Sequence, residues 1–349
     1  MSPAAIRVAV AGAGEFGRNH VRVWRELEGA ELIGIIDTNP ERAGKIAAEF
    51  GTRILPDLAA LKAERVDAVS LAVPTLLHAR LGCQLLDAGH DVLVEKPMAA
   101  SLAEADELIA AARRAARVLQ VGQVERFNPA VSAALKIVKR PMFFEVHRLG
   151  IFTPRSLDID VVYDVMIHDL DILLSLVNSD VIDLKAVGIP VITDKVDIAH
   201  ARIEFATGAV ANVTASRVST ERVRKMRFFQ EHEYISMDFA RQDVLRVRVQ
   251  QGSTAPSVAA MDALPEIAFE KLPSVPEEPL KAELRSFLDC VKSRRAPLVD
   301  GAAGRRALAL ADRVMEGILD HARRVKVMTG ALESRAAPEV RSFTPLETR

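Results

Sequence analysis

The sequence predicts an α/β protein of two domains: a doubly wound parallel sheet, then an α+β domain with a mainly antiparallel open sheet. Its 349 residues suffice for two domains, at roughly 100–200 residues each. Over the first 122 residues, short apolar runs alternate with amphipathic stretches, which is typical of a parallel sheet covered on both faces. Farther on, strand patterns follow one another with few helices between them, which indicates an antiparallel sheet.

The elements of the first half each have a local signal. Pro40 suits a first helical turn, and Gly51 suits the end of that helix. Ser101 and Glu104 have the spacing of a capping box, which predicts a helix start there. The strands expected from apolar runs are 6–11, 32–37, 68–73, 91–95 and 118–122, and the helices before residue 101 are 18–27, 40–50 and 76–87.

The second half is richer in strands. Residues 198–205 alternate apolar and polar side chains, which predicts a sheet with one wetter face. Residues 251–280 are rich in Pro, Ser and Ala and are expected to form loop. We divide the chain into domains 1–122 and 123–328 and a loose tail 329–349. The expected helices are 128–139, 160–177, 280–294 and 303–325, and the strands are 142–148, 182–189, 198–205, 209–216, 225–230, 233–238 and 244–250.

Composition argues against several classes of protein. With 46 basic and 47 acidic residues, the formal net charge is −1, which gives no electrostatic reason to expect nucleic acid or an anionic membrane as partner. Cys83 and Cys290 form no CxxC pattern, so we expect neither a disulfide framework nor a zinc cluster. No apolar stretch approaches ~20 residues, and no signal peptide is evident. We therefore expect a cytoplasmic protein.

A glycine-rich turn suggests a dinucleotide site. Gly12, Gly14 and Gly17 form G-x-G-x-x-G directly after one predicted strand and at the start of a helix, the context that this motif requires. Asp37 ends the next strand, where a carboxylate can bind both adenosine ribose hydroxyls and repel a 2′-phosphate. We therefore predict a Rossmann domain that binds NAD rather than NADP. The alternative is a turn and a strand-end aspartate without a ligand.

Two further patterns carry candidate catalytic groups. Lys96 follows the fourth predicted strand, at the sheet edge where ligands bind, although it could be a solvated lysine. Asp164, His168 and Asp171 are spaced by four and three residues in an apolar helix, which predicts one shared face. Carboxylates beside His168 would raise its pKa and suit proton transfer. A salt-linked surface stripe and a metal site are the alternatives.

Taken in order, these motifs resemble one family. The GAGEFG loop, Asp37, the segment 73–78 (VPTLLH), the EKP at 95–97 and the D-x-x-x-H-x-x-D helix resemble the Gfo/Idh/MocA oxidoreductases over about residues 6–325. The resemblance implies that Lys96 and His168 are the catalytic pair, that Asp164 lines the substrate site, and that the Lys96–Pro97 peptide is cis. One position departs from the family, because Met166 stands where many members have glycine.

The resemblance and the motifs together define the predicted sites, without a metal. The cofactor site comprises Gly12, Gly14, Glu15, Phe16, Gly17, Asp37, Val73, Pro74, Thr75, His78, Glu95, Lys96 and Pro97. The substrate site comprises Lys96, Arg126, Asn128, Arg155, Asp164 and His168. The family often associates through the C-terminal sheet, so a homodimer or homotetramer is expected.

A finer resemblance concerns the substrate. Segments 121–131, 153–171 and 215–227 resemble the subgroup that oxidises the 3-hydroxyl of UDP-N-acetylglucosamine, whose ketone product a transaminase can use in making amide-linked lipid A. These segments carry arginines, which bind diphosphates bidentately; we favour Arg126 and Arg155 over Arg217 and Arg222. The alternatives are an inositol, a free sugar or a tetrapyrrole as substrate, or a non-catalytic dinucleotide sensor.

The implied mechanism is hydride transfer from a secondary alcohol to NAD. The hydroxyl proton passes to His168 or to Lys96, and the sequence does not decide between them. Lys96 as an ammonium group would also stabilise the developing alkoxide.

Overall fold

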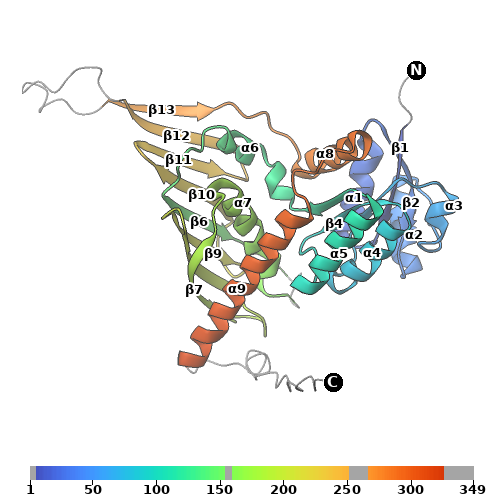
Figure 1. Ribbon diagram of the computed structural model, residues 1–349, viewed down its shortest axis with the longest axis horizontal. Helices are drawn as coiled ribbons and strands as arrows, with labels where there is room; N and C mark the ends of the chain where they lie inside the picture. The colour runs from blue at the N-terminus through green and yellow to red at the C-terminus, as the bar shows by residue number, and fades with distance from the viewer. Residues whose placement is uncertain (1–4, 154–158, 251–265, 326–349) are drawn as a thin grey trace, which may run out of the picture.

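The computed structural model describes residues 5–153, 159–250 and 266–325 and confirms the predicted fold class (Figure 1). The N-terminal sheet is parallel, with five strands in the order β2-β1-β3-β4-β5. Its elements are β1 (Ile6–Ala11), α1 (Glu15–Glu26), β2 (Ala30–Ile36), α2 (Pro40–Phe50), α3 (Ala60–Ala63), β3 (Ala68–Leu71), η1 (Thr75–Leu77), α4 (His78–Asp87), β4 (Asp91–Glu95), α5 (Leu102–Ala115) and β5 (Leu119–Gly122).

The strand order places a ligand crevice at one end of this sheet. Ile54 forms a parallel bridge with Ile35 beyond β2, which completes the Rossmann order with a single residue pair in place of an outer strand. From β1 the chain first runs outward to β2 and then returns to β3 on the other side of β1. The loops after β1 and β3 therefore diverge, and a dinucleotide binds at such a switch point.

The predicted helix signals act locally. The Asn39 side chain accepts a hydrogen bond from the Arg42 amide at 2.9 Å and caps α2, which Gly51 ends with a φ of 60°. The Ser101 hydroxyl caps α5 by accepting from the Glu104 amide at 3.2 Å. The Glu104 carboxylate reaches back to the amide of Ala100, one residue before the predicted partner. Both predicted helix starts are thus confirmed.

The second sheet has eight strands in the order β13-β12-β11-β10-β6-β9-β8-β7. All of its pairs are antiparallel except β6 with β9. The remaining elements are η2 (Val124–Phe127), α6 (Pro129–Leu135), β6 (Phe143–Leu149), η3 (Val162–Met166), α7 (Ile167–Val177), β7 (Val181–Ile189), β8 (Ile198–Phe205), β9 (Val210–Ser216), β10 (Val223–Gln230), β11 (Glu233–Asp238), β12 (Asp243–Gln250), β13 (Glu266–Leu272), α8 (Pro279–Ser293) and α9 (Gly301–Val325).

One expectation for this half was wrong. The predicted loop 251–280 contains β13, which pairs along its whole length with β12, from Val244–Leu272 to Gln250–Glu266. Pairing with a neighbouring strand overrides the Pro-rich flanks that suggested loop. The predicted helix 160–177 is confirmed, and it begins with a π-helical turn, η3, before α7 continues as α-helix. The predicted tail lies outside the described residues.

The eight-stranded sheet buries one face under helices. Its inner side chains form one core with α6, α7 and α9, as Phe144 and Val146 of β6 illustrate. Helix α9 packs on β7 and α7 and also on α5 of the Rossmann domain, so that it joins both halves (Figure 1). Arg148, which continues the alternation of β6, is buried as well.

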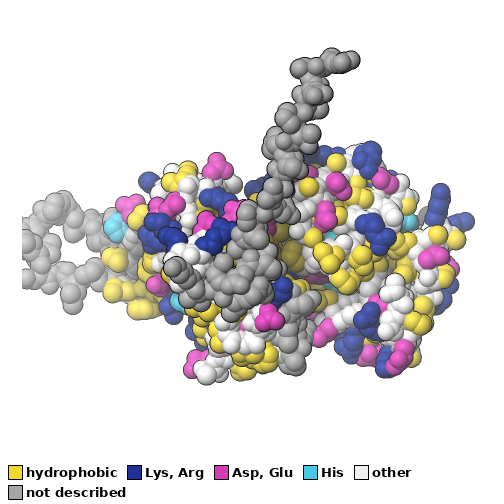
Figure 2. All heavy atoms as spheres, turned by 90° about the horizontal axis from the view of Figure 1, so that it is seen from below, with side chains coloured by type: hydrophobic (Ala, Val, Ile, Leu, Met, Phe, Trp, Pro, Cys, Tyr) yellow, Lys and Arg dark blue, Asp and Glu magenta, His cyan; other side chains and the backbone are white. Residues whose placement is uncertain are grey.

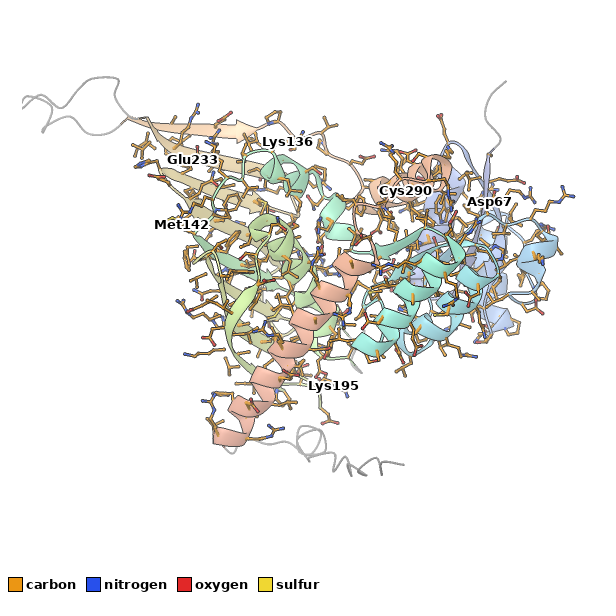
Figure 3. All side chains as sticks on the ribbon, in the orientation of Figure 1. Asp67, Lys136, Met142, Lys195, Glu233 and Cys290 are labelled. Carbon is orange, nitrogen blue, oxygen red and sulfur yellow. The ribbon has the colours of Figure 1, made fainter. Side chains whose placement is uncertain are left out.

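Helix α8 returns from the second half of the chain to the first. Leu284 and Phe287 are fully buried against β1 and α1, in one core cluster with Trp24. Figure 3 shows Cys290 on α8 beside the Rossmann domain, and Cys290 belongs to the same cluster. The N-terminal sheet therefore depends on a helix that lies almost 160 residues farther along the chain than β5.

The surface gives no sign of a single-signed field on the face in Figure 2. Acidic and basic side chains are interspersed there, which offers no electrostatic footprint for nucleic acid on this face. Within the described ranges, no helix is both long enough and apolar enough to cross a membrane.

Candidate active site

The glycine-rich turn has the geometry of a dinucleotide cradle. Gly12 adopts a φ of +107°, and a Cβ there would lie 2.2 Å from the carbonyl oxygen of Ala72. A Cβ on Gly17 would lie 1.9 Å from the Gly12 oxygen, whereas Gly14 faces open space. No side chain caps α1 at Gly14, so the first amides of the helix are left for an anion. These features fit the pyrophosphate of NAD.

Asp37 closes the turn from the neighbouring strand. One carboxylate oxygen accepts from the Ala13 amide at 2.6 Å, and the other accepts from the Asn39 amide and from the Arg42 guanidinium at 2.7 and 2.8 Å. Burial opposes its ionisation, but these hydrogen bonds prevail and hold the pKa of Asp37 below its ordinary value. An ionised carboxylate at this position favours ribose hydroxyls over a 2′-phosphate.

We expect Asp37→Ser to weaken NAD binding and to improve binding of NADP. The substitution removes the charge that repels a 2′-phosphate and releases Arg42, which is then free to pair with that phosphate. The measurement is kcat/KM for both cofactors, with Glu41→Gln on the same helix as the control. A wild-type enzyme that already prefers NADP would contradict this interpretation of Asp37.

The loops after β3 and β4 are tied together by His78. Its Nδ1 lies 2.9 Å from the Pro97 oxygen, and its Nε2 lies 2.9 Å from the Val73 oxygen. Burial lowers the pKa of His78, although both carbonyls act in the opposite direction. His78 thus links the loop that holds Val73 to the loop that holds Lys96.

Lys96 contacts the helix that carries Asp164 and His168 directly. The Lys96–Pro97 peptide is cis, as predicted. The Lys96 Nζ donates to the main-chain oxygen of Asp164 at 2.6 Å and to its carboxylate at 3.2 Å. Asp164 lies within the π-helical turn η3, a kind of distortion that is frequent at functional sites. The structure therefore joins two motifs that are 68 residues apart.

His168 has an environment opposite to the predicted one. The pKa of His168 is lowered well below its ordinary value, first by burial and then by the charges of Lys96, Arg148 and Arg224. The expectation of a raised pKa was wrong, because burial, followed by the charges of these cations, disfavours the protonated ring. His168 is therefore neutral near pH 7 and able to accept a proton.

The carboxylates near His168 are engaged elsewhere. Asp171 pairs with Arg126 at 3.3 Å, and burial raises the pKa of Asp171 to about 6. Asp169 binds Arg148 through two hydrogen bonds of 2.7 and 2.8 Å, and Arg148 also binds Glu125 at 2.7 Å. The spacing of the motif thus brings Asp164 and His168, but not Asp171, to the site.

Two cavities meet at Lys96. The larger, about 930 Å³, has walls from the β3 and β4 loops and from α9, with Glu95, Tyr163 and Met315 among its lining. The smaller, about 450 Å³, extends over the second sheet past His168 to several arginines. Phe16, Lys96 and Asp164 line both cavities. A substrate that reaches Lys96 from the second sheet can therefore meet a cofactor that enters from the Rossmann side.

Comparison with known proteins agrees with this architecture. The family model described as an oxidoreductase family with an NAD-binding Rossmann fold matches residues 6–123. The model of the GFO/IDH/MocA C-terminal domain matches residues 143–236. The UDP-N-acetylglucosamine 3-dehydrogenase of Acidithiobacillus ferrooxidans is 38% identical over 307 residues, which cover 88% of this chain and 95% of that enzyme. The chain belongs to the Gfo/Idh/MocA family.

Other relatives define how far the likeness extends. A solved structure of the Acidithiobacillus ferrooxidans enzyme matches with a TM-score of 0.83 and 37% identity, over 90% of this chain and 98% of that one. The D-apiose dehydrogenase of Paraburkholderia graminis is 29% identical over 87% of this chain and 85% of that protein. A levoglucosan dehydrogenase in complex with NADH and L-sorbose, at 19% identity, has a TM-score of 0.79 over 91% of this chain and 98% of that one, and shares the fold.

For this Gfo/Idh/MocA oxidoreductase, the predicted substrate residues separate into two groups. Lys96, Asp164 and His168 lie together at the cavities. Arg126 is bound to Asp171 and lines neither cavity, and Asn128 is buried as the cap of α6. Arg155 lies outside the described residues. Among the predicted cofactor residues, Glu15 lies in the first turn of α1 and lines neither cavity.

Sequence reasoning missed Arg148, Arg224 and Glu125, which also line the smaller cavity. The sequence contained a signal for both arginines, namely their positions in alternating strands. Arg148 shares the inner face of β6 with Val146, and Arg224 has the parity of buried Met226 on β10. A charged side chain in an apolar alternation indicates a buried or functional position. In the described part of the chain, no His, Cys, Asp or Glu cluster could hold a metal ion.

A buried carboxyl group lies behind the family's EKP motif. Glu283 of α8 is fully buried, and neither oxygen has a hydrogen-bond partner among the described residues. Burial, followed by the charges of Glu95 and Asp171, raises its pKa well above the ordinary value. The protonated form is therefore the one that the fold favours. Its contribution to stability is complete below the ordinary glutamate pKa and is lost as the pH rises through the folded-state pKa.

We expect Glu283→Gln to remove this loss of folding stability at alkaline pH. The amide has nearly the same shape and cannot ionise, so the variant should gain stability over the wild type as the solution becomes more alkaline. Thermal unfolding from about pH 5 to pH 9 measures the effect, with exposed Glu41→Gln as the control. Parallel curves for the wild type and Glu283→Gln over this range would show that Glu283 does not titrate with folding.

Proposed function

We propose that this oxidoreductase oxidises the 3-hydroxyl of UDP-N-acetylglucosamine to the 3-ketone, with loss of the hydroxyl proton and of the hydride on the same carbon. The observation that carries the proposal is the 38% identity with a UDP-N-acetylglucosamine 3-dehydrogenase over 95% of that enzyme. The arginine-lined cavity beside Lys96 and His168 supports it, because a diphosphate requires cationic partners. The ketone would then be available to a transaminase, and lipid A synthesis is the use that we favour.

The proposed chemistry begins with the transfer of a proton from the substrate to His168. Its neutral ring accepts the proton of the substrate hydroxyl, since burial and then the nearby cations keep the imidazole uncharged beforehand. NAD, held by the Rossmann half, would supply the acceptor for the hydride that leaves the carbon bearing this hydroxyl. Asp164 holds the Lys96 ammonium in place, and this charge stabilises oxygen as the hydroxyl loses its proton. We therefore assign His168 as the base and Lys96 as the electrostatic stabiliser.

In the cofactor half of the site, different residues bind different parts of NAD. The amides at the start of α1 bind the pyrophosphate, and Asp37 binds the adenosine ribose. Val73, Pro74, Thr75 and Glu95 line the larger cavity on the side of the Rossmann domain, where we place the nicotinamide. Glu95 is held by His20, whose Nε2 lies 2.8 Å from its carboxylate.

The test is NADH production with UDP-N-acetylglucosamine, free N-acetylglucosamine and myo-inositol. We expect the nucleotide sugar to have the highest kcat/KM by orders of magnitude. Activity on myo-inositol or the free sugar that equals or exceeds it would refute the substrate and leave the oxidoreductase family assignment. A chain that binds NAD but oxidises none of a broad sugar panel would favour the sensor alternative.

We also propose a homo-oligomer that forms through the outer face of the second sheet. Phe143, Phe229 and Tyr234 contact one another on that face, with ring centroids 5.7 and 5.2 Å apart. Phe269 continues this apolar stripe on β13 and is 72% exposed. Such a patch is typical of an interface. Analytical ultracentrifugation of the full chain would measure the assembly.

The free thiols of Cys83 and Cys290 suit the cytoplasm, where we place the enzyme.

A further inference from the structure

The two cavities that meet at Lys96 differ in charge. The larger cavity is lined by five carboxylates and one lysine, namely Glu95, Asp160, Asp164, Asp312, Glu316 and Lys96. The smaller cavity is lined by four arginines and Lys96 against two carboxylates, namely Arg148, Arg217, Arg222, Arg224, Glu125 and Asp164. A polyanionic group is therefore repelled by the larger cavity and attracted by the smaller one.

Two of the four arginines are already engaged. Arg148 is buried, binds both oxygens of Asp169 and one oxygen of Glu125, and lies over the Phe239 ring. Arg217 is also buried and is held by main-chain oxygens and by Asp197, whose carboxylate lies 3.5 Å from its Nε. These two arginines therefore hold the wall of the cavity together, and hydrogen-bond donors of both side chains are already used within the protein.

The other two arginines present their side chains to the cavity. Arg224 is 57% exposed, and its one carboxylate neighbour within ion-pair range among the described residues, Glu125, is 4.0 Å away and binds Arg148 more closely. Arg222 is exposed and has no carboxylate within that range in the described part of the chain. Both flank the start of β10, where Arg224 lies opposite Arg148 in the register with β6.

We propose that Arg222 and Arg224 bind the diphosphate of a nucleotide-sugar substrate. This inference rests on the proposed function and assigns the part of the substrate that these side chains recognise. Guanidinium groups bind phosphate oxygens bidentately, which fixes the orientation as well as the charge. The same cavity reaches His168 and Lys96, so a diphosphate at the arginines leaves the sugar at the catalytic end.

The diphosphate of NAD is a separate ligand with its own place. The glycine turn at Gly12–Gly17 and the uncapped start of α1 fit it on the Rossmann side, and no arginine of the smaller cavity belongs to that turn. The two diphosphates can therefore be distinguished by mutation. Loss of the arginines should change substrate affinity while NAD affinity stays the same.

The experiment compares Arg222→Gln, Arg224→Gln and the double variant with the wild type. The control is Arg114→Gln, which removes an exposed arginine that pairs with Asp87 on the Rossmann domain. Titration calorimetry with UDP, UMP, uridine, inorganic pyrophosphate and NAD measures binding without turnover. Steady-state kinetics with UDP-N-acetylglucosamine and with free N-acetylglucosamine then separates KM from kcat.

We expect each single variant to raise the Kd for UDP and the KM for UDP-N-acetylglucosamine by roughly ten- to hundred-fold. Uridine binding and NAD binding should stay near wild type. Arg224→Lys should restore only part of the affinity, because a lysine keeps the charge and loses the bidentate geometry.

Three results would overturn the inference in distinguishable ways. If the wild type binds UDP tightly and the double variant binds it equally well, the diphosphate lies elsewhere and the proposed function stands. If the wild type does not bind UDP and oxidises other alcohols faster, the proposed function is wrong and the subsite with it. An equal loss of NAD affinity in the variants would also contradict a substrate-specific role.

Discussion

Lys96→Ala should lower kcat by roughly 10²- to 10⁴-fold while the affinity for NAD changes little. The Lys96 ammonium lies between the Asp164 carboxylate and the point where both cavities meet. Its removal takes the positive charge away from the substrate oxygen as that oxygen loses its proton. It also leaves Asp164 as an unpaired negative charge at the same place, which destabilises the transition state further.

Two measurements test the role of Lys96. Fluorescence titration with NAD reports cofactor binding, and stopped-flow or steady-state kinetics reports turnover. Lys96→Met keeps the volume of the side chain and should be as slow as Lys96→Ala, whereas Lys45→Ala changes an exposed lysine far from the cavities and should have no effect. A kcat near wild type in Lys96→Met would remove the ammonium charge from the mechanism.

Gly17→Ala should weaken NAD binding by roughly 10²-fold or more, because displacement of the binding groups by about 1 Å can have that effect. The added Cβ would lie 1.9 Å from the carbonyl oxygen of Gly12 and 2.8 Å from its carbonyl carbon. Both atoms belong to the backbone and cannot rotate away. The turn and α1 must therefore move apart, and the amides that face the pyrophosphate move with them. The strain should also lower the free energy of unfolding by about 1–3 kcal/mol.

Gly44→Ala is the matched control for this variant. Gly44 lies inside α2, and a Cβ there would meet nothing within 4 Å. Since alanine is the better helix former, this variant should be stabilised by about 0.5–1 kcal/mol, with unchanged NAD binding. Thermal unfolding and NAD titration of both variants give a direct comparison. If Gly17→Ala bound NAD as tightly as Gly44→Ala, the close approach of α1 to the turn would be unimportant for the cofactor.

The parts of the site that local chemistry determines could be predicted from the sequence. The positive φ of Gly12, the capping of α5 by Ser101 and the position of Lys96 after β4 each depend on a few neighbouring residues. These features repeat in many proteins, because a turn or a helix end needs the same groups wherever it occurs. The family motifs added the link between Lys96 and the later helix.

The features that were missed depend on distant partners. Whether Arg126 faces a substrate or Asp171 is decided by how η2 packs on α7, and no local pattern contains that information. The pKa of His168 is lowered rather than raised because the fold buries the ring and brings Lys96, Arg148 and Arg224 to it from three other segments. Strand β13 needed its partner β12 to be recognised. Arg148 and Arg224 were the exceptions, since their places in the alternations of β6 and β10 could have identified them.

The return of α8 to the Rossmann domain has a consequence for synthesis on the ribosome. Trp24 of α1 meets Phe287 of α8 edge to face at 6.4 Å, and Leu284 covers the same apolar surface. A nascent chain that has only reached β5 leaves this surface open to water, so the nucleotide-binding half is not yet a finished unit. It matures only when the chain through Ser293 has emerged. For the same reason, we expect the first 122 residues alone to leave the apolar surface around Trp24 uncovered.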